Sequence, residues 1–187
     1  GIGLEDLGLE TDRGFVKVNE FYETSISGVY AIGDVAGPPL LAHAASHEGV
    51  IAAEHLSGEK PHPIDKMNIP GCTYCQPQVA SVGYTERSLK EQGIEYKVGK
   101  LPFVANGKAV ASNEKEGFVK TLIGKHGELL GAHIVGTHAT ELIHEYVLFK
   151  TMEGIDEEIY HTVHPHPTLG EFLAEAVMAA DNRSLNF

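Results

Sequence analysis

The sequence predicts an α+β fold for most of the chain, with an antiparallel sheet and flanking helices. Two observations carry this prediction. After residue 70, strand patterns mostly come first and long helical patterns come last, whereas a parallel sheet would require strands and helices to alternate. The segment GFVKTLIGKHGELLGAHIVG at 117–136 places two apolar runs around a glycine-flanked turn, which is typical of a β-hairpin.

Before residue 70 the chain does not make up a complete domain. Strand patterns at 14–19 and 28–34 and a helical pattern at 40–58 are the regular elements expected there. Gly58 is a typical C′ residue for this helix. Its expected apolar stripe consists of Ala45, Val50, Ile51, Ala53 and Leu56. So few elements cannot close a sheet around a core.

The stretch 58–71, GEKPHPIDKMNIPG, is expected to be a linker because it holds three prolines and shows no periodicity. It separates an incomplete domain at 1–69 from a self-contained domain at 70–187. The second domain opens with an extended segment at 72–84, which Pro77 interrupts.

The remaining elements of the second domain follow in order. Thr85 and Gly93 are a typical N-cap and C′ pair for a short helix, and 96–105 has a strand pattern. After the hairpin, a strong helix is predicted over 137–153 with an apolar stripe of Ala139, Leu142, Ile143, Tyr146, Val147 and Phe149. An acidic turn at 156–158 leads to a last helix, whose stripe holds Leu169, Phe172, Leu173, Ala176, Val177 and Ala180.

The composition excludes some classes of function. The chain has 187 residues, and 14 basic residues against 26 acidic ones give a formal charge of −12, which argues against nucleic-acid binding. No apolar run reaches the ~20 residues that span a membrane, and no signal peptide is visible. Two cysteines are too few for a disulfide scaffold, so a reducing compartment is expected. The expected location is the cytoplasm, or the mitochondrial matrix in a eukaryote.

Two short motifs are expected to carry no chemistry. GIGLED at 1–6 begins like a dinucleotide-binding fingerprint, but Asp6 replaces the last glycine and no strand precedes it, so a loop is expected. Cys72 and Cys75 lie in a segment expected to be extended, where their Cα atoms would be roughly 10 Å apart. A disulfide needs a shorter separation. Two unpaired thiols are therefore expected.

The segment TSISGVYAIGDVAGPPLLAH places Gly33 and Asp34 directly after an apolar strand pattern. A glycine lets the backbone approach a ligand closely, and a carboxylate at a strand end can accept hydrogen bonds from ribose-type hydroxyls. A strand, a turn and a helix cap would explain the same residues equally well.

The segment HTVHPHPTLGE at 161–171 allows three interpretations. A metal site is the weakest, because His164 and His166 cannot share a helix face and prolines fix the backbone around them. In the second, Thr168 is an N-cap and forms a capping box with Glu171. In the third, His166 is a general base, and Glu171 sets its tautomer and stabilises its cation. The local pattern slightly favours the cap and leaves the base open.

Together these motifs resemble the flavin-dependent pyridine nucleotide-disulfide oxidoreductases. T-x5-Y-A-x-G-D followed by L-A-H and H-E-G, within 24–49, is similar to the second flavin-binding motif of that family. PFVANGKA, GFVKTLIG, LLGAHIVGTHATELIHE and HPHPTLGE follow in the family's order, so the resemblance covers essentially the whole chain. TELIHE and Leu169 favour the dihydrolipoamide-oxidising branch, although glutathione reductases have a similar H-P-T-x-x-E motif.

The resemblance implies FAD and NAD as cofactors of the parent enzyme and a homodimer formed through 70–187. The base pair would be His166 and Glu171, and it would act on a dithiol in the partner subunit's active site. The dithiol would be dihydrolipoamide on a carrier domain. The residues expected to approach the flavin are Gly33, Asp34, Leu40, Leu41, Ala42 and His43, with His47 flanking them. His161 and His164 are expected only to pack or hydrogen-bond around their loop.

The family also has a first FAD fingerprint, a redox disulfide of C-x4-C type and an NAD domain, and none of them is in these 187 residues. The chain is therefore expected to be the C-terminal part of such an enzyme, with a remnant of the α/β FAD-binding domain at 1–69, and to be inactive alone. The alternatives are a catalytically idle homodimerisation module and a part of a glutathione-reductase-like enzyme.

Overall fold

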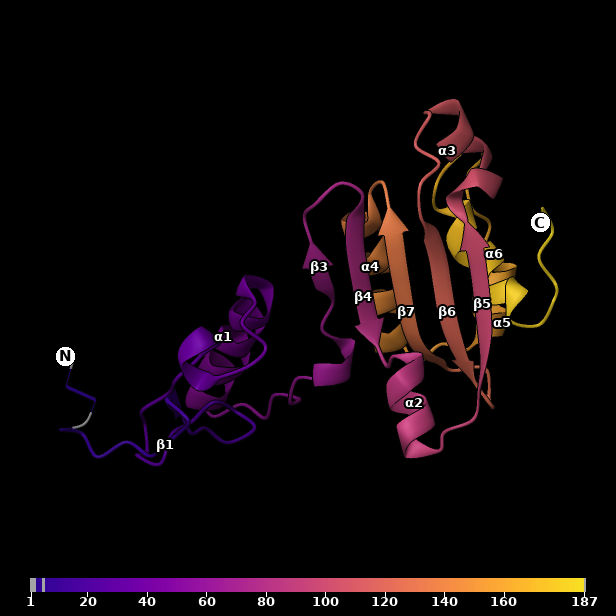
Figure 1. Ribbon diagram of the computed structural model, residues 1–187. Coiled ribbons are helices and arrows are strands. Elements are labelled where there is room, and N and C mark those ends of the chain that lie inside the picture. Colours follow the sequence, from indigo (N-terminus) through magenta and orange to yellow (C-terminus); the bar gives the residue numbers. More distant parts are fainter. Residues whose placement is uncertain (1–2, 5, 187) are drawn as a thin grey trace. The chain divides into compact units, whose positions relative to one another are not determined.

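The computed structural model describes residues 3–4 and 6–186, so the GIGLED segment lies partly outside the described residues. The chain divides into two compact units, unit 1 up to Lys66 and unit 2 from Met67 onward (Figure 1). The boundary predicted from the sequence lies three residues later, between residues 69 and 70. None of the helices in the described part of the chain has the length and apolar character needed to cross a membrane.

Unit 1 holds little regular structure apart from its helix. Its strands β1 (Thr11–Asp12) and β2 (Phe15–Val16) form a two-residue antiparallel pair, so the strand predicted at 14–19 is much shorter than expected. The strand predicted at 28–34 is wrong. Tyr30 makes a single bridge to Glu23, and the 3-10 helix η1 (Gly33–Ala36) follows. A strand persists only where a neighbour pairs with its backbone, and this segment has only a short local turn to pair with.

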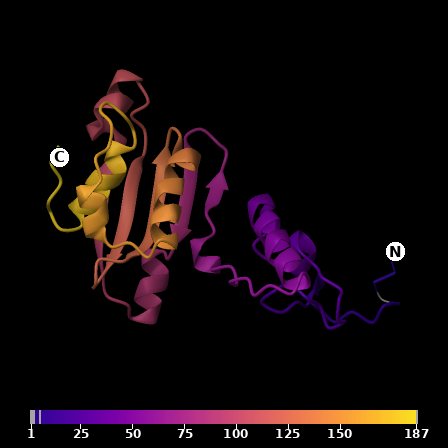
Figure 2. The same cartoon turned by 180° about the vertical axis from the view of Figure 1, so that it is seen from behind.

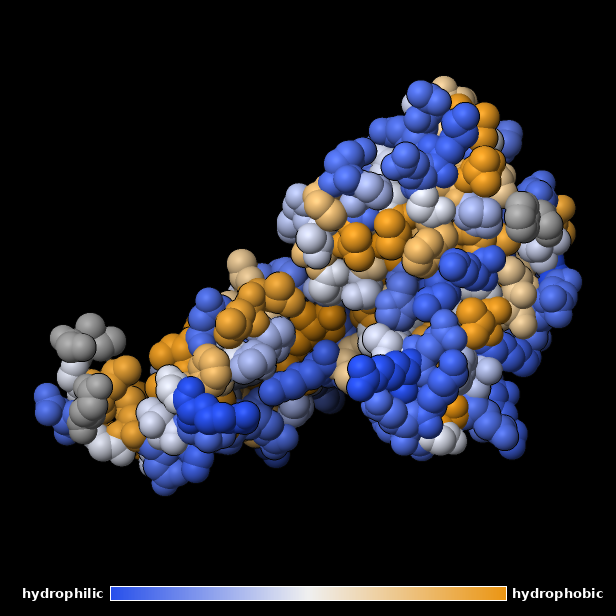
Figure 3. All heavy atoms as spheres, in the orientation of Figure 1, coloured by the Kyte–Doolittle hydropathy of each residue, from blue (hydrophilic) through white to orange (hydrophobic). Residues whose placement is uncertain are grey.

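The helix α1 (Ala42–Leu56) confirms the predicted helix, but Ile51 is the one residue of the predicted stripe that is fully buried. Its buried residues are Ala44, Glu48, Ile51 and Ala52. The predicted core positions Val50 and Leu56 are 54% and 65% exposed. The small core of unit 1 covers only one side of the helix, and hydrophobic atoms gather on the visible face of this unit (Figure 3).

Unit 2 contains the expected antiparallel sheet, which confirms the predicted fold class. Its five strands run in the order β3-β4-β7-β6-β5, and every neighbouring pair is antiparallel. The bounds are β3 Gly71–Thr73, β4 Gln78–Gly83, β5 Tyr96–Pro102, β6 Phe118–Gly124 and β7 Leu129–Gly136. The predicted hairpin is formed by β6 and β7, whose turn contains Gly127.

Two helices cover one face of this sheet and build the main core with it. The helix α4 (Ala139–Thr151) packs on β4 and β7, and α6 (Glu171–Ala179) packs on β5 and β6 (Figure 2). All six residues of the predicted α4 stripe are buried or half-buried. The tightest part of the core includes Phe103, Leu122, Ile134, Tyr146 and Leu173.

The extended segment predicted at 72–84 consists of two strands, and the chain is interrupted near Pro77, as predicted, by a turn that reverses its direction. Cys72 lies in β3, whereas Cys75 and Pro77 lie in the turn that reverses the chain into β4. Both thiols are free, as predicted, although the reason differs from the expected strand spacing. The Cys75 thiol donates to the Pro77 carbonyl at 3.0 Å.

Short helices account for further differences. The helix α2 (Glu86–Gln92) is confirmed with its predicted ends, because Thr85 Oγ1 accepts the Ser88 N–H and Gly93 is left-handed. The helix α3 (Gly107–Ala111) and the 3-10 helices η2 (Lys66–Asn68) and η3 (Phe103–Ala105) are absent from the prediction. The acidic turn predicted at 156–158 is the first turn of a helix, α5 (Asp156–His161). Carboxylates at this end are stabilised by the helix dipole.

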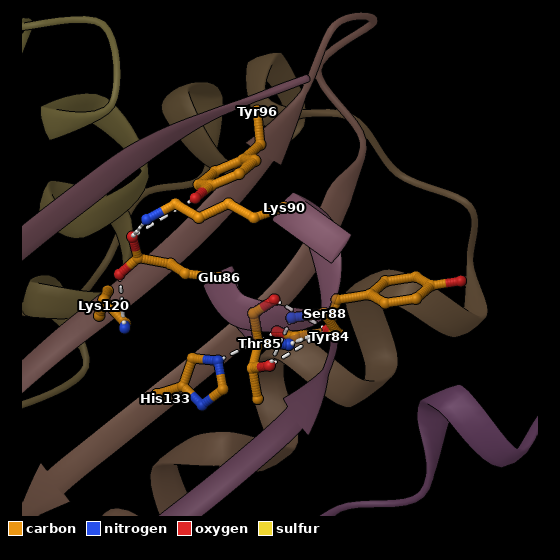
Figure 4. A network of polar contacts seen from close by, with 8 residues as sticks. All are labelled: Tyr84, Thr85, Glu86, Ser88, Lys90, Tyr96, Lys120 and His133. Atoms are coloured by element: carbon orange, nitrogen blue, oxygen red, sulfur yellow. Dashed lines mark hydrogen bonds and ion pairs between the residues drawn. The ribbon is translucent and has the colours of Figure 1, made fainter. Parts of the chain in front are cut away.

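A network of polar contacts joins α2 to the sheet (Figure 4). Lys120 Nζ on β6 donates to Glu86 Oε1 at 2.9 Å, and this hydrogen bond is the main reason why the pKa of Glu86 lies below its ordinary value. His133 on β7 contacts the Tyr84 carbonyl at 3.0 Å through Nε2. Burial lowers the pKa of His133, which keeps this imidazole in its neutral form over a wider pH range. The network fixes the segment that leads into α2.

The last helix is fastened to the sheet and to α4 by buried hydrogen bonds. Thr121 Oγ1 on β6 donates to the Ala176 carbonyl at 3.0 Å. Tyr146 on α4 donates its hydroxyl to the Leu173 carbonyl at 2.8 Å. Because α6 begins at Glu171, these bonds also fix the position of that carboxylate.

Candidate catalytic site at the start of the last helix

The structure brings His166 and Glu171 together. The contacts of Glu171 combine the helix-cap interpretation of this motif with the general-base interpretation. Glu171 Oε1 lies 2.9 Å from His166 Nδ1, and Glu171 Oε2 accepts the Thr168 N–H at 2.8 Å. One carboxylate therefore meets the backbone amide, as a capping box requires, and also the imidazole, as a base with its orienting group requires.

The predicted role of Thr168 as N-cap is wrong. The helix begins at Glu171 with Gly170 before it, and Thr168 Oγ1 donates to the Pro165 carbonyl at 2.7 Å. The hydroxyl is thus used within the loop and is not available to the helix. Only the glutamate half of the capping box is present.

The hydrogen bonds determine which nitrogen of His166 can accept a proton. A carboxylate only accepts, so Nδ1 must carry the hydrogen in the contact with Glu171, and Nε2 of the neutral ring is left as the acceptor. The His166 side chain is 79% exposed, whereas that of Glu171 is 26% exposed. Nε2 is therefore the atom at which this pair can receive a proton from another molecule.

Glu171 is held in its ionised form by its neighbours. Desolvation raises the pKa of this carboxyl, but the Thr168 N–H and the hydrogen bond and charge of His166 outweigh it, so that the pKa lies below the ordinary value. An ionised Glu171 is what the pair needs, because a neutral carboxyl would not stabilise an imidazolium.

This lowered pKa predicts a pH dependence of stability. The ionised carboxylate contributes stability above the unfolded-state pKa of about 4.3, and this contribution is lost as the pH falls through the lower folded-state pKa. Urea unfolding of the chain at pH 7 and at pH 3.5 should therefore show a smaller acid-induced loss for Glu171→Gln than for the unaltered chain. The matched control is Glu116→Gln, which removes an exposed carboxylate outside the helices and should keep the acid-induced loss of the unaltered chain. An equal acid loss in the unaltered chain and Glu171→Gln would contradict this.

The other histidines of the motif do not join a metal site. His164 contacts Glu145 and the Thr162 carbonyl, which confirms its expected role as a hydrogen-bonding residue of the loop, and His161 is exposed at the end of α5. In the part of the chain that the structure describes, no three His, Cys, Asp or Glu side chains are grouped so that they could hold a metal ion.

The residues expected to face a flavin lie together in unit 1, at η1 and the start of α1. Gly33 is buried with φ +69°, and its N–H donates to the buried Glu48 carboxylate at 2.6 Å. Asp34 is exposed beside it. The remaining residues lie where the chain enters α1: Leu40, Leu41, Ala42 and His43.

This end of unit 1 has the donor and acceptor groups that a flavin edge would use. The N-cap residue of α1, Leu41, makes no side-chain hydrogen bond to the start of the helix. The Asp34 carboxylate supplies an exposed acceptor. Sequence reasoning did not assign Glu48, although the H-E-G motif contains it, and the structure shows that it fixes the Gly33 backbone.

Comparison with known proteins places this geometry in a family. Residues 69–177 match the model of the pyridine nucleotide-disulphide oxidoreductase dimerisation domain, and residues 2–49 match the model of pyridine nucleotide-disulphide oxidoreductases. The chain is 53% identical to a dihydrolipoyl dehydrogenase of Zymomonas mobilis and 46% identical to one of Bacillus subtilis, over all of this chain and 40% of each relative.

Solved structures agree with these matches. LpdA of Mycobacterium tuberculosis superposes with a TM-score of 0.89 at 29% identity, over 95% of this chain and 39% of that protein. The chain thus spans about 40% of the length of the curated relatives it matches. Since the dimerisation-domain model alone covers more than half of its residues, the chain belongs to the pyridine nucleotide-disulphide oxidoreductase family.

Proposed function

We propose that the chain is the C-terminal part of an FAD-dependent dihydrolipoyl dehydrogenase, which oxidises dihydrolipoamide to lipoamide with NAD as the acceptor. The observation that carries the proposal is the His166–Glu171 pair, whose Nδ1 is bound at 2.9 Å and whose ring is open to solvent. The sequence identity of the chain with dihydrolipoyl dehydrogenases supports the choice of substrate. The chain alone is expected to be inactive.

In this proposal His166 acts as the general base for a substrate thiol. Nε2 takes the thiol proton, the resulting imidazolium keeps its Nδ1–H on Glu171, and the carboxylate stabilises the cation. The thiolate that is left is the nucleophile, whereas the thiol is largely protonated near pH 7. It attacks one sulfur of an enzyme disulfide, forms a mixed disulfide and releases the other sulfur as a thiolate. The second substrate thiol, once deprotonated, attacks the substrate sulfur of the mixed disulfide, which closes the lipoamide ring and releases the second enzyme sulfur as a thiolate.

FAD would be held in part by the exposed Asp34 carboxylate and by the backbone of Leu40, Leu41, Ala42 and His43, which lie together where the chain enters α1. Gly33 serves this arrangement by keeping its backbone close to α1, since a Cβ there would meet Ala45 Cβ at 3.2 Å. The flavin, when bound, supplies the redox chemistry that takes electrons from the dithiol and passes them to NAD. NAD itself would bind outside this chain.

We also propose that residues 70–187 form a homodimer, in which the base of one subunit serves the active site of its partner. Three exposed apolar side chains of unit 2 favour burial by another molecule: Leu148 (57%), Met152 (73%) and Val163 (94%). Leu148 lies on α4, Met152 is the residue that follows this helix, and Val163 lies in the loop before His166. Light scattering of the chain at micromolar concentration should give twice the monomer mass, and a monomer would contradict the dimer.

The substrate is tested with a chimera in which this chain replaces the matching segment of the Zymomonas mobilis enzyme. We expect the chimera to bind FAD and to reduce NAD with dihydrolipoamide far faster than with reduced glutathione. A preference for glutathione would favour the glutathione-reductase-like alternative. A dimer that binds flavin and accepts electrons from NADH, but oxidises neither thiol, would favour the idle dimerisation module.

A further inference from the structure

His164 lies two residues before His166 and is much better buried, with 10% of its side chain exposed against 79%. Its Nε2 lies 2.8 Å from Glu145 Oε1, and its Nδ1 lies 3.1 Å from the Thr162 carbonyl oxygen. A carbonyl and a carboxylate can only accept. A ring that satisfies both contacts must therefore donate from both nitrogens, and such a ring is an imidazolium.

The partner of His164 belongs to a well-fixed part of the fold. Glu145 is followed on α4 by Tyr146, which is fully buried and donates its hydroxyl to the Leu173 carbonyl of α6. Thus Glu145 binds the loop at His164, and the next residue of α4, Tyr146, binds the last helix at Leu173. The loop that carries His166 is fastened to α4 on one side and to Glu171 of α6 on the other.

The charge of His164 also reaches the candidate catalytic pair. Besides the burial that raises the pKa of Glu171 and the hydrogen bonds that lower it, the positive charge of His164 lowers it further. The charged groups that the structure places around this ring are Glu145 from α4 and Glu171 from α6, both acidic. An imidazolium at His164 therefore favours the ionised state of the carboxylate that orients His166.

We propose that the hydrogen-bonded pair of His164 and Glu145 is a positioning unit for the candidate base, which holds the loop so that the His166 ring stays on Glu171. Its effect on catalysis rests on the proposed function, whereas the positioning itself is a property of this chain. His164 and Glu145 are positioning residues and do not exchange a proton with the substrate.

The positioning is tested on the chain itself by ¹H–¹⁵N spectra of its imidazole rings, which show which ring nitrogens carry hydrogens. His164 should show a hydrogen on Nε2, the nitrogen that faces Glu145, and the neutral His166 ring should show its hydrogen on Nδ1. In Glu145→Gln, the population of His166 rings that have left Glu171 should rise roughly tenfold, the size expected for the loss of a hydrogen bond to a charged group. Glu141→Gln is the matched control, because it removes the same charge from an exposed position of α4.

A His164 ring without a hydrogen on Nε2, or an unchanged His166 tautomer in Glu145→Gln, would overturn the proposal. If Glu145→Gln does not fold, His164→Gln carries the same test, because it removes the ring that contacts Glu145 and keeps a polar side chain. In the chimera, Glu145→Gln should lower kcat for dihydrolipoamide roughly tenfold and leave flavin reduction by NADH unchanged. Failure of the proposed base would appear separately, as dithiol oxidation that survives His166→Gln.

Discussion

Replacing His166 by Gln in the chimera should lower the rate of dihydrolipoamide oxidation by roughly a hundredfold to ten-thousandfold, the usual contribution of a general base. The reason is that Nε2 is the proton acceptor of the His166–Glu171 pair, and a glutamine amide has no comparable basic atom. Flavin reduction by NADH needs no thiol deprotonation, so its rate should stay unchanged. Both rates can be measured on the same preparation by stopped-flow absorbance.

His161→Gln is the matched control for this variant. It removes an imidazole from the same segment, at an exposed position at the end of α5, and should leave both rates unchanged. Equal losses of dithiol oxidation and NADH-dependent flavin reduction in His166→Gln would contradict the base assignment, because they would indicate damage to the flavin site or to the fold.

Replacing Gly99 by Ala should destabilise unit 2 by roughly 3 kcal/mol. Gly99 lies on β5 directly beneath α6, and a Cβ there would overlap the Ala176 carbonyl oxygen and lie 2.9 Å from Thr121 Oγ1. These two atoms form the buried hydrogen bond that fastens α6 to the sheet. Because backbone atoms cannot yield as a flexible side chain can, α6 must move away, and Glu171 moves with it. Urea unfolding measures the loss of stability.

Gly107→Ala provides the comparison for Gly99→Ala. Gly107 is the first residue of α3, and a Cβ there would meet no atom within 4 Å. This substitution should leave stability unchanged or raise it by up to about 1 kcal/mol, because alanine loses less conformational entropy than glycine on folding. If Gly99→Ala and Gly107→Ala were equally stable, the close approach of β5 and α6 would not be a constraint on the fold.

Sequence patterns predict the parts of this fold whose stability is local. The caps Thr85 and Gly93 and the apolar stripe of α4 act over a few residues, so they could be identified without knowledge of the tertiary structure. The strand predicted at 28–34 depends instead on a neighbouring strand. Its apolar run indicates burial but not the partner that would supply hydrogen bonds, and this is why the prediction was wrong.

The candidate site also has one contact that the local sequence could suggest and another that depends on the tertiary structure. His166 and Glu171 are five residues apart, so the local sequence could suggest that they meet, although it could not show that one carboxylate also binds the Thr168 amide. The contact between His164 and Glu145 spans 19 residues and depends on how α4 packs beside the loop. No local pattern predicts such a pair, because its geometry is a result of the packed core.

The most direct test of the base is the pH dependence of flavin reduction by dihydrolipoamide, compared between the chimera and its His166→Gln variant in single-turnover experiments. If His166 takes the thiol proton, the rate of the variant should approach that of the chimera as the pH rises towards the pKa of a free thiol, about 8.5. At that pH the thiol loses its proton to solvent and no longer needs a base. A deficit that stays the same from pH 6 to pH 9 would contradict the account, because it would show that His166 supports the site in some way other than by removing a proton.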